Sequence, residues 1–142
     1  MFGAQTILLL GILCISAQYN LGFIYDTGLG VSQDYYSAVK WYKLAAGKGL
    51  AVAQFKLGEM YYFGKGTSKN DDQAFYWNKK AAVQGDRIAE HNLAHMYYFG
   101  EGTSTNKKKT LYWYKKAASQ GDEGAQYSLG AMYYFGEGTS TN

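Results

Sequence analysis

The chain has 142 residues and a formal net charge of +3, with 14 basic and 11 acidic residues interspersed along it. This balance argues against a nucleic-acid-binding surface and against attraction to an acidic membrane. The single cysteine, Cys14, excludes an intrachain disulfide, and the lack of proline leaves no rigid linker that would mark a domain boundary.

Residues 1–16 form a separate apolar segment whose hydrophobic run, residues 7–15, is too short to span a bilayer. The run resembles the apolar region of a secretory signal, with small residues before a cut at Ala17. No basic residue precedes it, since the first one is Lys40. The alternative is a helix that caps the first repeat. The signal predicts a secreted or periplasmic protein, and the capping helix a cytoplasmic one.

From Ala17 onward the sequence repeats every 36 residues. The segment MYYFGEGTSTN occurs at residues 96–106 and again at 132–142, and looser copies begin at Met60 and Phe23. Self-similarity at this period is typical of stacked repeat architectures. We therefore divide the repeat region, residues 17–142, into three full repeats and one partial repeat: 17–52, 53–88, 89–124 and 125–142.

Each repeat predicts a first helix that ends at a glycine. In the second repeat an apolar stripe at helical spacing consists of Ala53, Leu57, Met60 and Tyr61. Gly64 follows this stripe and can end the helix with a positive φ. A glycine inside the helix, at Gly58, predicts a Trp or Tyr ring of a neighbouring helix packed on the bare backbone, because glycine there is otherwise unfavourable.

Each full repeat also predicts a second helix. Its expected N-cap residues recur one period apart, at Asp34, Asn70 and Asn106. The side chains that this helix is expected to bury in the second repeat are Ala74, Trp77, Ala81 and Ala82. Gly85 is expected to end the helix. The caps expected for the following repeats are Asp86 and Asp122.

The pattern A-x-x-x-L-G-x-x-Y-x-x-G-x-G followed by W-Y-x-x-A-A-x-x-G resembles the Sel-1-like repeat family, a relative of the tetratricopeptide repeat. The resemblance covers residues 17–142. It implies an all-α fold, a right-handed α-solenoid of 36-residue helix-turn-helix repeats whose first helices line a concave face. Family members mostly act as adaptors for other proteins. The resemblance therefore implies a non-enzymatic scaffold that binds a protein or peptide.

A second stripe on the first helices lies beside the apolar stripe and, by the same resemblance, faces the concave groove. Its members are Phe55, Glu59, Tyr62, His91, His95, Tyr98, Tyr127 and Tyr134. Tyrosine suits peptide recognition because its aromatic body carries a polar end. The alternative is that these rings only pack between neighbouring repeats.

The sequence gives only weak signals for metal binding, nucleotide binding or catalysis. His91 and His95 share one helix face at i, i+4 spacing, but only a carboxylate such as Glu59 or Glu90 could complete a zinc site. The glycines of FGEG follow a predicted helix rather than a strand, so they do not indicate a nucleotide-binding loop. No nucleophile–base arrangement is recognisable. We expect no enzymatic activity, cofactor or metal, and a protein or peptide partner rather than nucleic acid or a stable membrane span.

One alternative function remains open. A cysteine-rich secreted branch of the same family has been linked to β-lactam binding or hydrolysis, which leaves a secreted hydrolase as the second hypothesis. That branch carries a disulfide in each repeat, which this chain does not.

The last residue, Asn142, aligns with the expected caps Asn70 and Asn106. A cap without a following helix, together with the apolar stripe of the fourth repeat, predicts that the chain is a fragment of a longer array.

Overall fold

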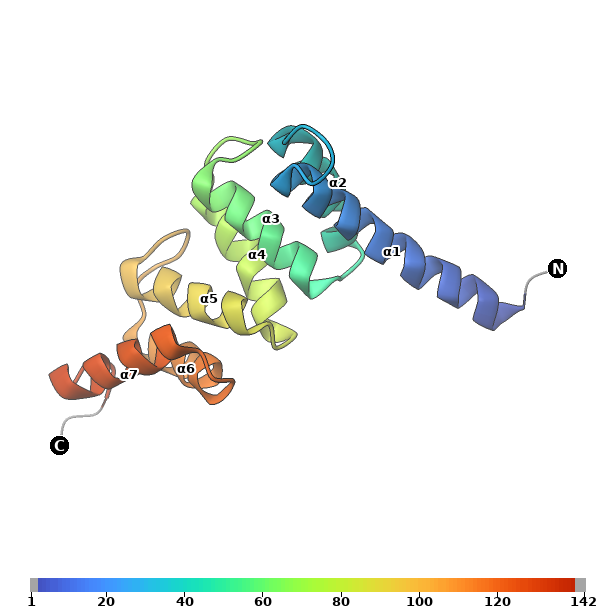
Figure 1. The fold of residues 1–142 in the computed structure, drawn as a ribbon. Helices are drawn as coiled ribbons and strands as arrows, with labels where there is room; N and C mark the ends of the chain where they lie inside the picture. The colour runs from blue at the N-terminus through green and yellow to red at the C-terminus, as the bar shows by residue number, and fades with distance from the viewer. Residues whose placement is uncertain (1–2, 140–142) are drawn as a thin grey trace.

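The computed structural model describes residues 3–139, and this range is an all-α solenoid of seven helices and no strand (Figure 1). The helices are α1 (Ala4–Thr27), α2 (Tyr35–Gly47), α3 (Ala51–Phe63), α4 (Asp71–Val83), α5 (Arg87–Phe99), α6 (Lys107–Ser119) and α7 (Glu123–Phe135). Each helix packs mainly against its neighbours in the chain, and the closest pairs are α1 with α2, α3 with α4, and α5 with α6. These pairs are the predicted helix-turn-helix repeats.

The helix starts agree with the predicted caps. Asp34, Asn70 and Asn106 each accept a hydrogen bond from a backbone N–H three residues on, at the starts of α2, α4 and α6. Asp86 and Asp122 cap α5 and α7 in the same way. Each cap satisfies one of the backbone donors that a helix start leaves without an intrahelical partner.

The glycine after each first helix has a left-handed backbone, as at Gly64 with φ 65°. A second turn glycine two residues later brings the loops after α3, α5 and α7 close to the preceding repeat. A Cβ atom on Gly66 would overlap the carbonyl group of Tyr35, and one on Gly102 would overlap that of Asp71. Glycine is therefore required at these positions both by its positive φ and by the close approach.

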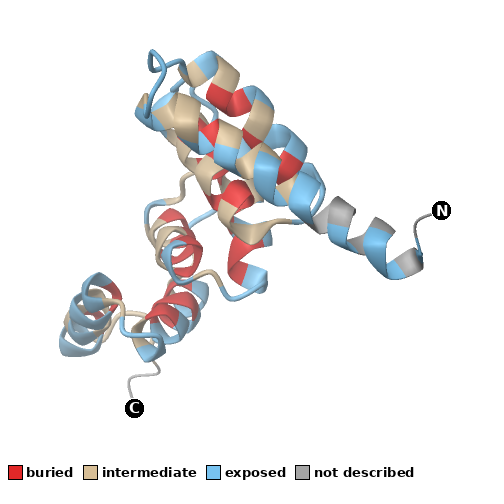
Figure 2. Cartoon of the chain, turned by 45° about the vertical axis from the view of Figure 1, so that its right-hand side comes forward, coloured by how far each residue is buried: buried red, intermediate tan, exposed pale blue. Residues whose placement is uncertain are grey.

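Two buried clusters fill the space between the helices. One involves α2 and α3 with partly buried residues of α1, and the other extends from α3 to α7. Figure 2 shows the buried residues in red on the sides of the helices that face one another. Alanine is the commonest of the buried hydrophobic residues, so neighbouring helices can approach closely, and larger side chains fill the remaining space.

Glutamine side chains fix one repeat relative to the next. The Gln84 amide donates to Gly49 O (2.9 Å) and to Gln54 Oε1 (2.8 Å). One repeat later, Gln120 donates to Gly85 O (3.1 Å) and to Glu90 Oε2 (2.8 Å). Gln54 and Glu90 are buried, so these bonds satisfy polar groups that would be unfavourable without partners.

The buried side of the second helix differs from the prediction at one position. In α4 the buried residues are Ala74, Asn78, Ala81 and Ala82. Trp77, predicted to be buried, is only partly buried and packs against the edge of the core. The aromatic ring predicted over Gly58 is not found there, because Gly58 lies against the Asn78 side chain. One repeat earlier, the Tyr42 ring does lie over the equivalent glycine, Gly22.

The apolar N-terminal segment forms the first part of α1. Ala17 lies inside this helix, and the part of α1 before it extends away from the rest of the molecule (Figure 1). Leu9 and Leu13 are exposed there, whereas Ile15 packs against the core. None of the helices within residues 3–139 combines the length and apolar character needed to cross a bilayer. Cleavage before Ala17 stays a prediction.

Candidate functional site

The first helices α3, α5 and α7 together carry a row of side chains that we call the first-helix face. It is defined by Glu59, Tyr62, His91, His95, Tyr98, Tyr127 and Tyr134. Two hollows lie along it. The first, of about 230 Å³, lies between α3 and α5 and is lined by Glu59, Tyr62, Phe63, Asn78, His91, Asn92, His95 and Met96. We call it the Asn78 cavity.

The second hollow lies one repeat further along, between α5 and α7. Its volume is about 580 Å³, and its lining includes His95, Tyr98, Tyr114, Tyr127 and Glu137. We call it the Tyr127 cavity. Because His95 borders both cavities, they form one continuous series across the first-helix face.

The lining of the Asn78 cavity differs from that of its equivalent, the Tyr127 cavity, at one buried position. Tyrosine fills the equivalent position in the neighbouring repeats, at Tyr42 and Tyr114, and both rings are buried. Asn78 is equally buried, but its side chain is much shorter. Its amide donates to Ala74 O (2.9 Å) and its Oδ1 accepts from Asn92 (3.3 Å). The Asn78 cavity is therefore bordered by amide groups where the Tyr127 cavity is bordered by the Tyr114 ring.

Tyrosine hydroxyls on this face bond to glutamates of the next repeat. Tyr62 donates to Glu101 Oε1 (3.1 Å), and Tyr98 donates to Glu137 Oε2 (3.0 Å). Burial and the neighbouring Glu101 carboxylate raise the pKa of Tyr62. Lys107 lies 3.5 Å from the centre of the Tyr98 ring and also bonds Glu137. These contacts hold the rings in place.

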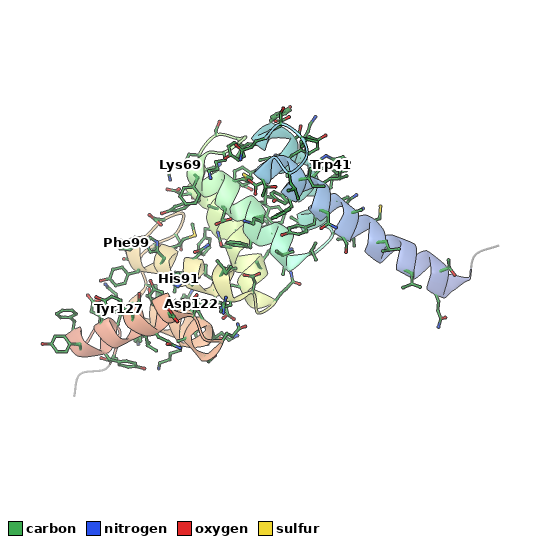
Figure 3. The ribbon with its side chains drawn as sticks, viewed as in Figure 1. Trp41, Lys69, His91, Phe99, Asp122 and Tyr127 are labelled. Atoms are coloured by element: carbon green, nitrogen blue, oxygen red, sulfur yellow. The ribbon has the colours of Figure 1, made fainter. Side chains whose placement is uncertain are left out.

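Each histidine on this face is paired with a carboxylate through Nδ1. His91 Nδ1 lies 2.8 Å from Asp122 Oδ1, at the start of α7 (Figure 3). His95 Nδ1 lies 3.3 Å from Glu101 Oε2. Partial burial raises the pKa of Asp122, but the hydrogen bonds from the Ala125 N–H and His91 outweigh it, and the pKa is lowered. Asp122 thereby orients the His91 ring, whereas Glu101 Oε2 accepts no hydrogen bond from His95.

The predicted site residues therefore fall into three groups. Phe55 is 5% exposed and belongs to the core, so it is not available to a partner. Glu59, Tyr62, His91, His95 and Tyr98 are partly buried and border the cavities. Tyr127 and Tyr134 are 82% and 85% exposed. Among residues 3–139, no three His, Cys, Asp or Glu side chains lie close enough together to hold a metal ion.

Several residues of the site were not predicted. Asn78 and Asn92 form the polar wall of the first cavity, and Glu101, Asp122 and Glu137 hold the rings. Asn78 could have been found from the sequence, because the 36-residue alignment shows Tyr42 and Tyr114 at its position. The carboxylate contacts could not, since they depend on how consecutive repeats stack.

The model of the Sel1 repeat matches residues 15–50, 51–86, 87–122 and 124–142, nearly all of the repeat region. The chain belongs to the Sel1 repeat family. The matched units begin about two residues before the repeats drawn from the sequence pattern. A search among curated proteins gives no match.

Two solved structures of Sel1-like repeat proteins are similar to the chain over most of its length. The Sel1 repeat protein from Oxalobacter formigenes is 41% identical, with a TM-score of 0.85, over 89% of this chain and 52% of that one. The protective antigen c5321 of uropathogenic Escherichia coli, described as displaying an SLR fold, is 40% identical, with a TM-score of 0.87, over 88% of this chain and 27% of that one. This Sel1 repeat chain thus spans about half or less of those relatives.

The cysteine-rich protein B of Helicobacter pylori is also similar, with a TM-score of 0.69 over 89% of this chain and 98% of that one. Its identity is 22%, so the likeness shows the shared solenoid fold alone. It gives no support to the secreted-hydrolase alternative.

Proposed function

We propose that this Sel1 repeat chain is a non-enzymatic scaffold that binds a peptide or an extended segment of another protein along its first-helix face. The observation that carries the proposal is the pair of adjoining cavities, which share His95 and are bordered by partly exposed aromatic and polar side chains. Neighbouring hollows one repeat apart suit an extended chain whose side chains enter them in turn.

The side chains of this face are also held in position, which favours binding. Tyr62 and Tyr98 are tied to Glu101 and Glu137, and His91 to Asp122. Groups that are already ordered lose little conformational entropy when a ligand binds, so more of the contact energy appears as affinity. Sel1 repeat proteins are generally protein-interaction scaffolds, which is consistent with this use of the face.

The proposal is tested with a displayed library of random peptides selected against the purified chain. Tyr98→Ala is expected to weaken the selected peptides by about tenfold or more, since interface tyrosines often contribute that much. Tyr112→Ala is the matched control, because Tyr112 is an exposed tyrosine on the second helix of the same repeat. Its peptide affinity should be unchanged.

Stability must be measured alongside binding. Tyr98→Phe keeps the ring but removes the bond to Glu137, so it separates contact with the peptide from the link between repeats. If Tyr98→Ala lowers the melting temperature but leaves affinity per folded molecule unchanged, the ring has only a packing role. Selected peptides that depend on Tyr112 rather than on Tyr98 would contradict the proposal.

A further inference from the structure

We propose that the second helices carry a separate docking surface for an acidic, amphipathic segment of a partner protein. This surface goes beyond the function proposed for the first-helix face and does not depend on it. We call it the second-helix face. It is defined by exposed side chains at equivalent positions of α2, α4 and α6: Lys40, Lys43 and Leu44; Tyr76, Lys79, Lys80 and Val83; Tyr112, Lys115 and Lys116.

The side chains of this face form one stripe along each second helix. In α4, Tyr76, Lys80 and Val83 stand at i, i+4 and i+7, which places them on one side of the helix. The 36-residue period puts Tyr112 and Lys116 at the positions of Tyr76 and Lys80 in α6. Because each repeat stacks on the next in the same way, the stripes recur in register along the solenoid.

A hollow of about 450 Å³ lies within this face, between α4 and the start of α3. Its lining residues are Gln54, Tyr76, Lys79, Lys80, Val83 and Gln84. Both charged residues of this lining are lysines. Tyr76 and Val83 are 46% and 67% exposed, so apolar surface is open to solvent beside the two ammonium groups. The hollow thus combines positive charge with apolar contact area.

The charged groups around this hollow are mainly positive. Residues 35–58, which include α2 and the start of α3, contain no Asp or Glu. Lys43 and Lys48 belong to this segment. Among residues 3–139, no ion pair involves Lys43, Lys79 or Lys80. These ammonium groups are therefore available to the carboxylates of a partner.

The carboxylates nearest to α4 along the chain do not offset this charge. The two aspartates of α4 lie in its first turn, at the opposite end of the helix from Lys79 and Lys80. Asp86, which follows α4, accepts a hydrogen bond from the Ala89 N–H (2.9 Å) at the start of α5. The next residue, Arg87, is exposed and adds a positive charge.

The equivalent place one repeat later does carry carboxylates. Glu90 stands at the position of Gln54, and Asp86 stands at the position of Leu50. Leu50 gives α3 no side-chain cap, so no carboxylate offsets the positive end of that helix dipole. The hollow beside α3 and α4 is therefore the part of the second-helix face that complements an anionic guest best.

The lysines of α4 and α6 lie over tyrosine rings one turn earlier. Lys80 Nζ lies 5.1 Å from the centre of the Tyr76 ring, and Lys116 Nζ lies 5.5 Å from that of Tyr112. The attraction to the ring face orders each ammonium without occupying its donors with a carboxylate. A side chain that is ordered in this way loses less conformational entropy when it pairs with a partner.

The composition of the face favours an acidic protein segment over nucleic acid or a membrane. Arginine matches phosphate groups best, and the one arginine of the chain, Arg87, lies outside the face. Leu44 and Val83 are exposed beside the lysines, which suits apolar side chains between acidic ones. The net charge of +3 is also small for the long-range attraction on which nucleic-acid and membrane binding depend.

The probe is the capped, fluorescein-labelled peptide EELEEFEEL, titrated against the full chain by fluorescence anisotropy in about 0.1 M salt. Its neutral counterpart QQLQQFQQL should bind about tenfold or more weakly, and EEGEEGEEG, which lacks apolar side chains, should also bind more weakly. The double variant Lys79→Gln with Lys80→Gln should weaken the acidic peptide by about fivefold, since each exposed charge pair contributes modestly.

The matched control is Lys65→Gln with Lys69→Gln, in the loop after α3. It removes the same charge from two exposed lysines outside the face and should leave the affinity unchanged. Both double variants change exposed side chains, so both should fold, and thermal unfolding checks this. If the variant at Lys79 and Lys80 does not fold, Lys115→Gln with Lys116→Gln replaces it.

Equal binding of the acidic and neutral peptides would overturn the proposal. Equal weakening by the two double variants would also overturn it, because the peptide would then respond to net charge rather than to this face. A single-stranded oligonucleotide, or vesicles that contain phosphatidylserine, binding through Lys79 and Lys80 more tightly than the acidic peptide would assign the face to phosphate groups and contradict a protein partner. Library peptides that still bind through Tyr98 would leave the proposed function standing in each of these cases.

Discussion

Residues 96–106 and 132–142 have the same sequence, but the helical parts of the two copies, at the ends of α5 and α7, lie in different surroundings. Both copies form the end of a helix with a left-handed glycine after it, with φ 74° at Gly100 and 68° at Gly136. Tyr97 is 5% exposed, whereas its counterpart Tyr133 is 46% exposed. The helix and its end are thus local properties, and burial comes from the neighbouring helices.

The difference follows from packing. α5 packs against both α4 and α6, whereas α7 packs mainly against α6. Met96 and Met132 face the preceding repeat and are equally buried, at 2% and 3%. In a solenoid each repeat contacts only its neighbours, so a helix with one packed side has part of the stabilisation of a helix with two.

The largest effect should come from removing the tyrosine whose surroundings differ most. Tyr97→Ala is expected to cost about 3–5 kcal/mol of unfolding free energy, as for a buried aromatic, because the ring packs edge to face on Phe75. Tyr133→Ala should cost about 1 kcal/mol or less, since a half-exposed ring loses less contact. Urea denaturation of both variants measures the comparison, and equal losses would contradict it.

Tyr97 and Tyr133 also test whether neighbouring helices cause the difference in burial between them. A chain extended after Asn142 by a copy of residues 107–121 should have a higher melting temperature, and Tyr133→Ala should then cost nearly as much as Tyr97→Ala. Amide exchange in residues 123–139 should also slow toward that of α5. An extension without effect on exchange would show that α7 is already as stable as the interior.

The second largest effect concerns the turn glycines and extends the comparison to the other end of the solenoid. Gly102→Ala should cost about 2–4 kcal/mol, because its Cβ adds overlap with the Asp71 carbonyl to the strain of a positive φ. Gly30 also has a positive φ, but nothing lies within 4 Å of its would-be Cβ. Gly30→Ala should therefore cost about 1–2 kcal/mol, from backbone strain alone. A smaller loss at Gly102 than at Gly30 in thermal unfolding would be inconsistent with the close approach.

The third effect concerns the caps of α5 and α7. Asp86→Ala and Asp122→Ala should each cost about 1 kcal/mol at neutral pH, with the larger loss at Asp122 because it also holds His91. The pKa of Asp122 is lowered in the folded chain. Its contribution is therefore present above the ordinary value of 3.8 and is lost as the pH falls through the lower folded value.

The pH dependence is checked by urea denaturation of the wild type and Asp122→Ala at neutral pH and at several values below 4. The difference in unfolding free energy between the wild type and Asp122→Ala should become smaller as the Asp122 carboxylate becomes protonated. If this difference in free energy stays constant down to the lowest pH at which the chain folds, the charged form of Asp122 is not its cause.

The smallest effect should be a gain of stability at the less covered end. Gly130 lies inside α7 with nothing within 4 Å of its would-be Cβ, so Gly130→Ala should stabilise the chain by about 1 kcal/mol. At the equivalent Gly58, a Cβ would lie 2.6 Å from the Asn78 amide nitrogen, and the same change should destabilise. Opposite signs in thermal unfolding are expected, and a loss of stability at Gly130 would mean that this side of α7 is covered.

Much of the fold and part of the site followed from the sequence. The caps at Asn70 and Asp86 and the helix end at Gly64 were predicted correctly, because a cap depends on residues within one turn of it. Phe55 was assigned to the groove because helical spacing does not distinguish two adjacent stripes when both carry aromatic residues. Trp77 was placed inside because helical spacing fits it as well as its neighbour Asn78, which is the buried residue.

The sequence by itself determined the repeat, its helices and their ends. These features arise from local hydrogen bonds and from a 36-residue period that recurs along the chain. The tertiary structure alone decided which of two identical tyrosines is buried, which carboxylate lies beside each histidine, and which side chains border each cavity. Those outcomes depend on contacts between residues about 30–40 positions apart, such as Tyr62 with Glu101 and His91 with Asp122, and such contacts form only when consecutive repeats stack.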